Sequence, residues 1–129
     1  MGVPTDPTDL VSVDLAKKRV YVQFRGTLTR AVAEQMREAY RNAILKVGSG
    51  YTAVSIFEDY VPGTIEVQEV LSSMITMAND AGCRAVARVA QGSVFGQMQL
   101  GRLQRAVEAD YPVHNCETVA EAEAYLDGE

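Results

Sequence analysis

The fold is decided by residues 51–81, which read YTAVSIFEDYVPGTIEVQEVLSSMITMANDA. The apolar run at residues 52–57 has no clean alternation, which predicts a central strand covered by helix on at least one face. Residues 60–63 predict a turn, because proline fixes one backbone angle and glycine permits a strained one. Apolar residues then recur at helical spacing until Gly82, which predicts a helix ending there. This strand, turn and helix form one unit of an α/β domain.

Two alternating stretches precede this unit. Residues 11–15 and 20–25 alternate apolar and polar side chains, and the short polar link at residues 16–18 predicts that they form a hairpin. Thr29 is the expected N-cap of a helix that carries one apolar stripe as far as Val47. Residues 1–9, with two prolines and two aspartates, predict a flexible N-terminal arm.

Two further strand and helix pairs follow Gly82. Residues 84–90 predict a strand, and Ser93 is the expected N-cap of the next helix. Residues 111–116 predict a short last strand, and a capping box at residues 118–121 begins the final helix. The regular alternation predicts one α/β domain over residues 10–127, with four helices and a mixed, mostly parallel five-stranded sheet after the hairpin.

The composition excludes several classes of function. Seventeen acidic and twelve basic side chains give a net charge of −5, which argues against a nucleic-acid partner. The apolar runs are too short to span a bilayer, and the first ten residues contain no hydrophobic leader, so we expect a cytoplasmic protein without membrane insertion. Cys83 and Cys116 are expected to be two separate reduced thiols, since about a strand length divides them. No metal or cofactor motif is present, and none is expected.

This order of elements resembles the STAS family, the domain of sulfate transporters and bacterial anti-sigma-factor antagonists. The best local support comes from residues 54–74, from the link Ala-Gly-Cys-Arg at 81–84, and from the ending Glu-Thr-Val-Ala-Glu-Ala at 117–122. The resemblance covers residues 11–126 and is closer to the divergent, stand-alone bacterial relatives described as STAS or SEC14-like. It implies strands that follow one another in sequence across the sheet, with helices mainly on one side.

In regulatory members of that family, a serine in an Asp-Ser-Ser/Thr-Gly turn opens the second helix. A partner kinase that is also an anti-sigma factor phosphorylates it. The corresponding turn here is Tyr-Val-Pro-Gly-Thr at 60–64, so the motif is absent and Thr64 takes the position as the phosphorylation candidate. A helix N-terminus favours a phosphate, but Glu58 and Asp59 lie nearby and would repel it. The interpretation we favour for Thr64 is a plain N-cap.

Polar side chains follow the ends of two neighbouring strands. Ligands of open α/β sheets bind at this carboxyl edge, so these side chains are candidates to converge on one crevice, where paired acids can hold a metal or act as acid and base. The simpler interpretation is a loop with solvated acids. Arg88 is expected to lie on a strand face that is open or meets a partner. The candidates for a ligand or partner surface are Glu58, Asp59, Tyr60, Arg88, Gln91 and Ser93.

The sequence therefore predicts a non-enzymatic regulatory or protein-interaction module of the anti-sigma-factor-antagonist type. We expect a homodimer with a regulatory protein partner, because no catalytic constellation is evident and polar and apolar residues mix on the strand faces. Two alternatives stand beside this prediction. One is a small-ligand or lipid-binding domain that uses the space between helices and strand ends. The other is an enzyme that uses Glu58, Asp59 and Ser93.

Overall fold

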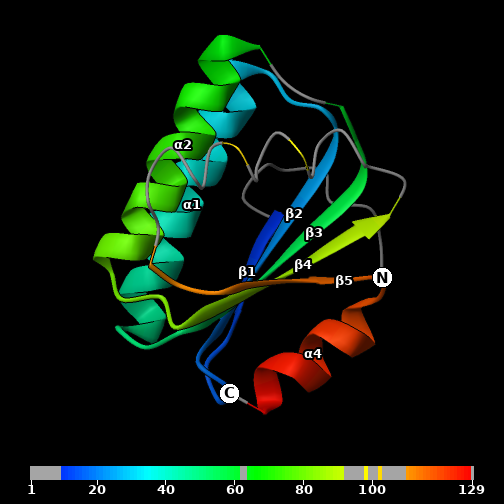
Figure 1. The fold of residues 1–129 in the computed structure, drawn as a ribbon. Helices are drawn as coiled ribbons and strands as arrows, with labels where there is room; N and C mark the ends of the chain where they lie inside the picture. Colours follow the sequence, from blue (N-terminus) through cyan, green and yellow to red (C-terminus); the bar gives the residue numbers. More distant parts are fainter. Residues whose placement is uncertain (1–9, 62–63, 92–97, 99–101, 103–109, 129) are drawn as a thin grey trace.

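The computed structural model describes residues 10–61, 64–91, 98, 102 and 110–128 (Figure 1). The elements, in chain order, are β1 (Val11–Asp14), β2 (Arg19–Thr27), α1 (Arg30–Val47), β3 (Thr52–Val61), α2 (Ile65–Asp80), β4 (Ala85–Gln91), β5 (Val113–Cys116) and α4 (Val119–Asp127).

The five strands form one sheet in the order β1-β2-β3-β4-β5. β1 and β2 form the antiparallel hairpin, and β2, β3, β4 and β5 are parallel to one another. This arrangement confirms the prediction of an α/β fold with a mostly parallel sheet. β3 is the central strand, and Val54 in its middle is fully buried, as expected for a strand covered on both faces.

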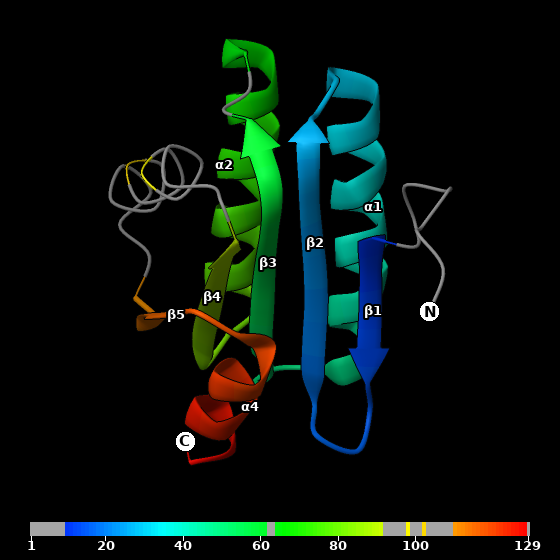
Figure 2. The same cartoon turned by 90° about the vertical axis from the view of Figure 1, so that its right-hand side faces the viewer.

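Helices cover both faces of this sheet. α1 and α2 lie side by side on one face, whereas α4 lies on the other (Figure 2). Successive residues of a strand point to opposite faces, so Val20, Val22 and Phe24 of β2 join the core beneath α1 and α2. Arg19 and Tyr21 of the same strand contact α4. The placement of helices mainly on one face thus holds for α1 and α2 but not for α4.

The described part of the chain contains three helices, where the sequence predicted four. The helix predicted to begin at Ser93, and the arm predicted at residues 1–9, lie outside the described residues. Within the described residues, no helix combines the length and the apolar character that a bilayer crossing requires.

The predicted turn at residues 60–63 was placed too early, because β3 continues to Val61. A register shift explains the extra length: Arg25 lies opposite Glu58, but Thr27 lies opposite Val61, so β3 contains one additional residue there. Asp59 adopts a φ of 52°, which few residues other than glycine adopt. The extra residue turns Tyr60, which follows Asp59, toward the core face of the sheet. It also lets β2 and β3 stay paired as far as Thr27 and Val61.

Aromatic rings fill the core beside this bulge. Phe24 and Phe57 are register partners and stack with ring centroids 4.7 Å apart. Tyr60 packs edge-on against both, with centroids 6.0 and 5.6 Å away. Such pairs add about 1 kcal/mol each beyond their buried area, which favours continuation of β3 over a turn at Tyr60.

Side-chain caps begin all three described helices. Thr29, Thr64 and Thr118 each accept a hydrogen bond from a backbone N–H in the first turn of the helix that follows. Each satisfies a donor that helix geometry leaves without a partner. Gly82, with a φ of 81°, follows α2 as predicted. The thiols of Cys83 and Cys116 are both free and buried.

Candidate functional site

The carboxyl edge of β3 presents the acidic residues that the sequence singled out. Glu58 and Asp59 are exposed, and Glu58 is the register partner of Gln91 on β4. The strand ends therefore meet as predicted. Glu58 Oε2 lies 3.0 Å from Arg25 Nε, an ion-pair distance without hydrogen-bond alignment. The Gln91 side chain and Ser93 lie outside the described part of the structure.

Tyr60 does not belong to this edge, and its assignment as a surface candidate was wrong. Its side chain is buried in the aromatic cluster with Phe24 and Phe57. The bulge at Asp59 is the cause, because it turns Tyr60 toward the helices. A periodicity-based prediction cannot foresee such a shift.

Thr64 lies at this edge as the N-cap of α2, with its Oγ1 3.4 Å from the Val67 N–H that donates to it. The residues around it are unexpectedly apolar for an exposed surface. Val61 is 49% exposed and Ile65 is 73% exposed. Glu66 and Glu69 are exposed next to them in α2. We call Glu58, Asp59, Val61, Thr64, Ile65, Glu66 and Glu69 the carboxyl-edge surface.

Arg88 does not lie on an open face of the sheet, so that part of its prediction was wrong. Its face of the sheet is not open but covered by α1 and α2, and the residue is only 8% exposed. It belongs to one row of register partners across the sheet, with Ser55 on one side and Asn115 on the other. We call these three residues the polar row. The row two residues earlier on the same face is wholly apolar and consists of Val20, Ala53, Val86 and Val113.

A cavity of about 70 Å³ lies between α1, α2 and the part of the sheet that carries Ser55 and Arg88. Four of the residues that line it have polar side chains: Arg88, Ser55, Tyr40 and Tyr111. The remaining wall is apolar and includes Val22, Ala53, Leu71, Met74, Ile75 and Ala78. The cavity is therefore lined mainly by apolar residues, with four polar residues among them.

Burial controls the ionisation of the groups around this cavity. It lowers the pKa of Arg88 by penalising the charged form, while the nearby Tyr111 opposes that change. It raises the pKa of Tyr111 and of Tyr40 well above the ordinary value for a phenol. The Tyr40 and Tyr51 hydroxyls lie 2.6 Å apart and satisfy each other. All three phenols are neutral at physiological pH and are available only as hydrogen-bonding groups.

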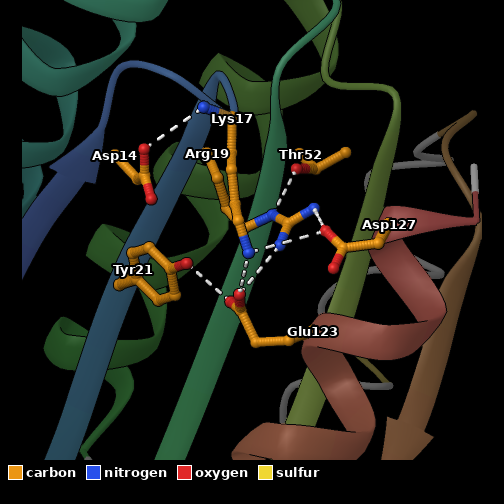
Figure 3. Close-up of polar contacts among 7 residues, drawn as sticks. All are labelled: Asp14, Lys17, Arg19, Tyr21, Thr52, Glu123 and Asp127. Atoms are coloured by element: carbon orange, nitrogen blue, oxygen red, sulfur yellow. Dashed lines mark hydrogen bonds and ion pairs between the residues drawn. The ribbon is translucent and has the colours of Figure 1, made fainter.

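A third polar group, which the sequence did not predict, fastens α4 to the sheet (Figure 3). Arg19 donates from Nη1 to Glu123 Oε2 at 3.1 Å, from Nη2 to Asp127 Oδ1 at 3.0 Å, and from Nε to Thr52 Oγ1 at 3.0 Å. Tyr21 Oη donates to Glu123 Oε1 at 2.5 Å. We call Lys17, Arg19, Tyr21, Thr52, Glu123 and Asp127 the α4 anchor.

The electrostatics of the α4 anchor favour its charged state. Burial alone would raise the pKa of Glu123, but hydrogen bonds from Lys17 and Tyr21 and the charge of Arg19 outweigh burial and lower that pKa. The sequence contained one signal for this cluster. Glu123 and Asp127 are four residues apart and therefore share a helix face, and three cations, Lys17, Lys18 and Arg19, stand in or next to the hairpin turn. We interpret the α4 anchor as structural, because its charges neutralise one another.

The single histidine of the chain, His114, and the thiol of Cys116 both lie on β5. His114 stacks on Tyr125 of α4, with ring centroids 4.2 Å apart, and Cys116 lies in the core on the same sheet face. No group of three or more His, Cys, Asp or Glu side chains comes together there in a way that would hold a metal ion. His114 thus has a packing role beside α4.

No protein-family model matches the chain. A search of curated proteins likewise found no match.

Proposed function

We propose that the chain is a non-enzymatic regulatory module that binds a protein partner, of the anti-sigma-factor-antagonist type but without the usual phosphorylatable serine. The observation that supports this proposal is the exposure of Val61 and Ile65 on either side of Thr64. Neither side chain is part of a buried core cluster, and exposed large apolar side chains at a mostly polar surface are typical of protein interaction sites.

The charges of the carboxyl-edge surface define the partner that would fit it. Exposed Glu58, Asp59, Glu66 and Glu69 belong to the same surface, where Glu58 Oε2 lies 3.0 Å from Arg25 Nε and Glu66 Oε1 lies 3.9 Å from Arg30 Nη1. A partner face with an apolar centre and a basic rim would complement this arrangement, and the net charge of −5 would speed its association. Because the same acids disfavour a phosphate on Thr64, binding in this proposal does not depend on phosphorylation.

The proposal includes self-association as a homodimer. β1 is one edge strand of the sheet, pairing only with β2 among the described strands. A groove lies between β1 and α1, with Val11, Val13, Leu15 and Ala43 in its wall. An edge strand beside a groove that mixes these apolar residues with Ser12, Asn42 and Lys46 suits a second copy of the chain. Light scattering at tens of micromolar should give twice the mass of the chain, and a monomer would contradict self-association.

Partner binding is tested by affinity capture from the cells that make the protein, with quantitative mass spectrometry of what is recovered. Three forms are compared: the native chain, a Val61→Ser and Ile65→Ser double variant, and a Leu45→Ser control. Leu45 is exposed on α1, away from the carboxyl-edge surface. A partner should be enriched by the native chain and the control and lost from the double variant. Equal enrichment by all three would rule out this surface.

A small-ligand-binding domain is the second candidate function, and the cavity beside Arg88 favours it. An apolar space with a few convergent polar groups is the usual form of a ligand site. The volume of about 70 Å³ is far below that of drug-sized pockets, so a full-length lipid chain would not fit. Native mass spectrometry of the purified protein should show the added mass of a small molecule, lost on denaturation.

A further inference from the structure

One row of exposed side chains runs along α1 beside the groove that this helix forms with β1. Glu38, Asn42 and Lys46 follow one another at intervals of four residues, so they lie on one side of the helix, and all three are exposed. Asn42 and Lys46 also line the groove, together with Ser12 and Val13 of β1. The row therefore has an acid at one end, an amide in the middle and a base at the other end.

Such a row is complementary to itself when two copies of α1 pack antiparallel. In a two-fold contact, each residue touches a counterpart on the second copy, and the same contact occurs a second time with the roles exchanged. With Asn42 at the two-fold axis, a residue four positions after it faces the residue four positions before it on the second copy. Lys46 therefore faces Glu38 of the second copy, twice in the dimer. A parallel arrangement in register would place like charges together instead.

The apolar side chains beside this row match under the same symmetry. Leu45, three residues after Asn42, is 77% exposed. It faces Ala39, three residues before Asn42, on the second copy. Ala39 and Ala43 line the groove and are small, so a second helix can approach closely there. A large exposed side chain thus meets a small one at both ends of the contact, and its removal from water stabilises the dimer.

The spacing of the sheet suits this contact between helices. α1 lies over β1 and β2 (Figure 2), and neighbouring strands of a sheet are about 4.8 Å apart. If β1 pairs with β1 of the second copy, the two α1 helices lie two strand spacings apart, or about 10 Å. Packed helices have their axes about 8–10 Å apart. A sheet that continues across the two-fold axis therefore brings the two α1 helices to packing distance.

We propose that the chain forms a two-fold dimer in which α1 packs antiparallel against α1 of a second copy, centred on Asn42. This inference rests on the self-association proposed above and names its surface, symmetry and register. Glu38 Oε2 also lies 3.7 Å from Arg41 Nη1 of its own helix. Both of these side chains are exposed, so that ion pair is weak and does not prevent contact with Lys46 of the second copy.

The first test is disulfide crosslinking of Asn42→Cys in the full chain. The two natural thiols, Cys83 and Cys116, are buried. Thr76→Cys is the matched control, because Thr76 is equally classed as exposed but lies on α2. Under mild oxidation at tens of micromolar, Asn42→Cys should form covalent dimers at least tenfold faster than Thr76→Cys on non-reducing gels.

Charge reversal then tests the register without an added thiol. Lys46→Glu places acids opposite each other at both ends of the contact, and the dimer Kd from sedimentation equilibrium should rise roughly tenfold or more. Glu38→Lys should also weaken the dimer, although it reduces the net negative charge of the chain and would strengthen the dimer if net charge alone mattered. The double variant with both reversals restores opposite charges at both ends, so its Kd should return to within about threefold of the native value.

The outcomes separate this contact from self-association in general. If light scattering shows a dimer but Asn42→Cys and Thr76→Cys crosslink at equal rates, or the double reversal fails to restore the native Kd, the dimer uses another surface and this contact is refuted. A chain that stays monomeric and crosslinks equally slowly at both sites would refute self-association as well. Capture of a partner by the carboxyl-edge surface is tested separately, through Val61 and Ile65.

Discussion

Removing the acid of the α4 anchor and removing its base should lower the free energy of unfolding by different amounts. Glu123→Ala removes the acceptor for Arg19 and Tyr21 and leaves a guanidinium whose side chain is only 3% exposed. Arg19→Met instead leaves Glu123 and Asp127, whose side chains are 23% and 51% exposed and can be hydrated. We therefore expect the alanine variant to be the less stable of the two, although both break the same ion pair.

The magnitudes follow from these exposures. A hydrogen bond to a charged group contributes about 1.5–3 kcal/mol, and stranding a buried charge costs more than removing an exposed one. Because the carboxylate is partly exposed and Asp127 still binds Arg19, we expect Glu123→Ala to lose about 2 kcal/mol of unfolding free energy. Arg19→Met should lose about 1 kcal/mol or less, since methionine retains the packing of the aliphatic stem.

The assay is urea unfolding followed by far-ultraviolet circular dichroism, with Glu38→Ala as a control on the exposed face of α1. The pH dependence supplies a second reading. The folded state lowers the pKa of Glu123, so its contribution is present above an unfolded-state pKa of about 4.3 and is lost as the pH falls through the lower folded-state value. The difference in unfolding free energy between the native chain and Glu123→Ala should therefore become smaller below about pH 4. A larger loss in Arg19→Met than in Glu123→Ala would refute the reasoning.

Three shorter predictions concern a cap, a glycine and a thiol. Thr64→Ala should lower the unfolding free energy by about 0.5–1 kcal/mol in thermal melts, whereas Thr64→Asp should keep the cap and the stability. Gly82→Ala should cost about 1–2 kcal/mol, because φ is 81° and a Cβ there would collide with the Ser49 hydroxyl; Ser49→Ala in the same chain should restore part of that loss if the collision matters. In a Cys116→Ser background, Cys83 should react with a disulfide reagent roughly 200-fold more slowly in the folded than in the unfolded chain at pH 8, because burial raises its pKa to about 11 against about 8.5 for an exposed thiol. Equal rates would contradict the burial of that thiol.

The sequence predicted those parts of the fold that local rules govern. Helical spacing and threonine caps located α1, α2 and α4, and the apolar run at residues 52–57 identified β3 as the central strand. The end of β3 could not be predicted, because the bulge at Asp59 depends on pairing with β2, a partner distant in sequence. Tyr60 was misplaced for the same reason.

The candidate site was predicted less completely than the fold. Glu58 and Asp59 lie at the carboxyl edge as expected, since strand ends follow from chain direction alone. Arg88 was assigned to a face that is open or meets a partner, because charge usually avoids a covered one. The prediction failed because alternation shows which residues of a strand share a face of the sheet. It does not show which of the two faces the helices cover. The α4 anchor was missed because its partners are more than a hundred residues apart.

The two proposed activities share α2 but use different parts of it. The carboxyl-edge surface includes Ile65 in its first turn, whereas the cavity wall begins at Leu71, about 9 Å farther along the helix axis, and continues to Ala78. Ile65 points to solvent and Ala78 into the core. Residues this far apart with no shared contacts usually act additively. Ala78→Met, which narrows the cavity, should therefore leave partner capture unchanged. The Val61→Ser and Ile65→Ser double variant should leave unchanged the added mass seen by native mass spectrometry. Loss of partner capture in a folded Ala78→Met protein would show instead that the cavity and the surface act through a common rearrangement of α2.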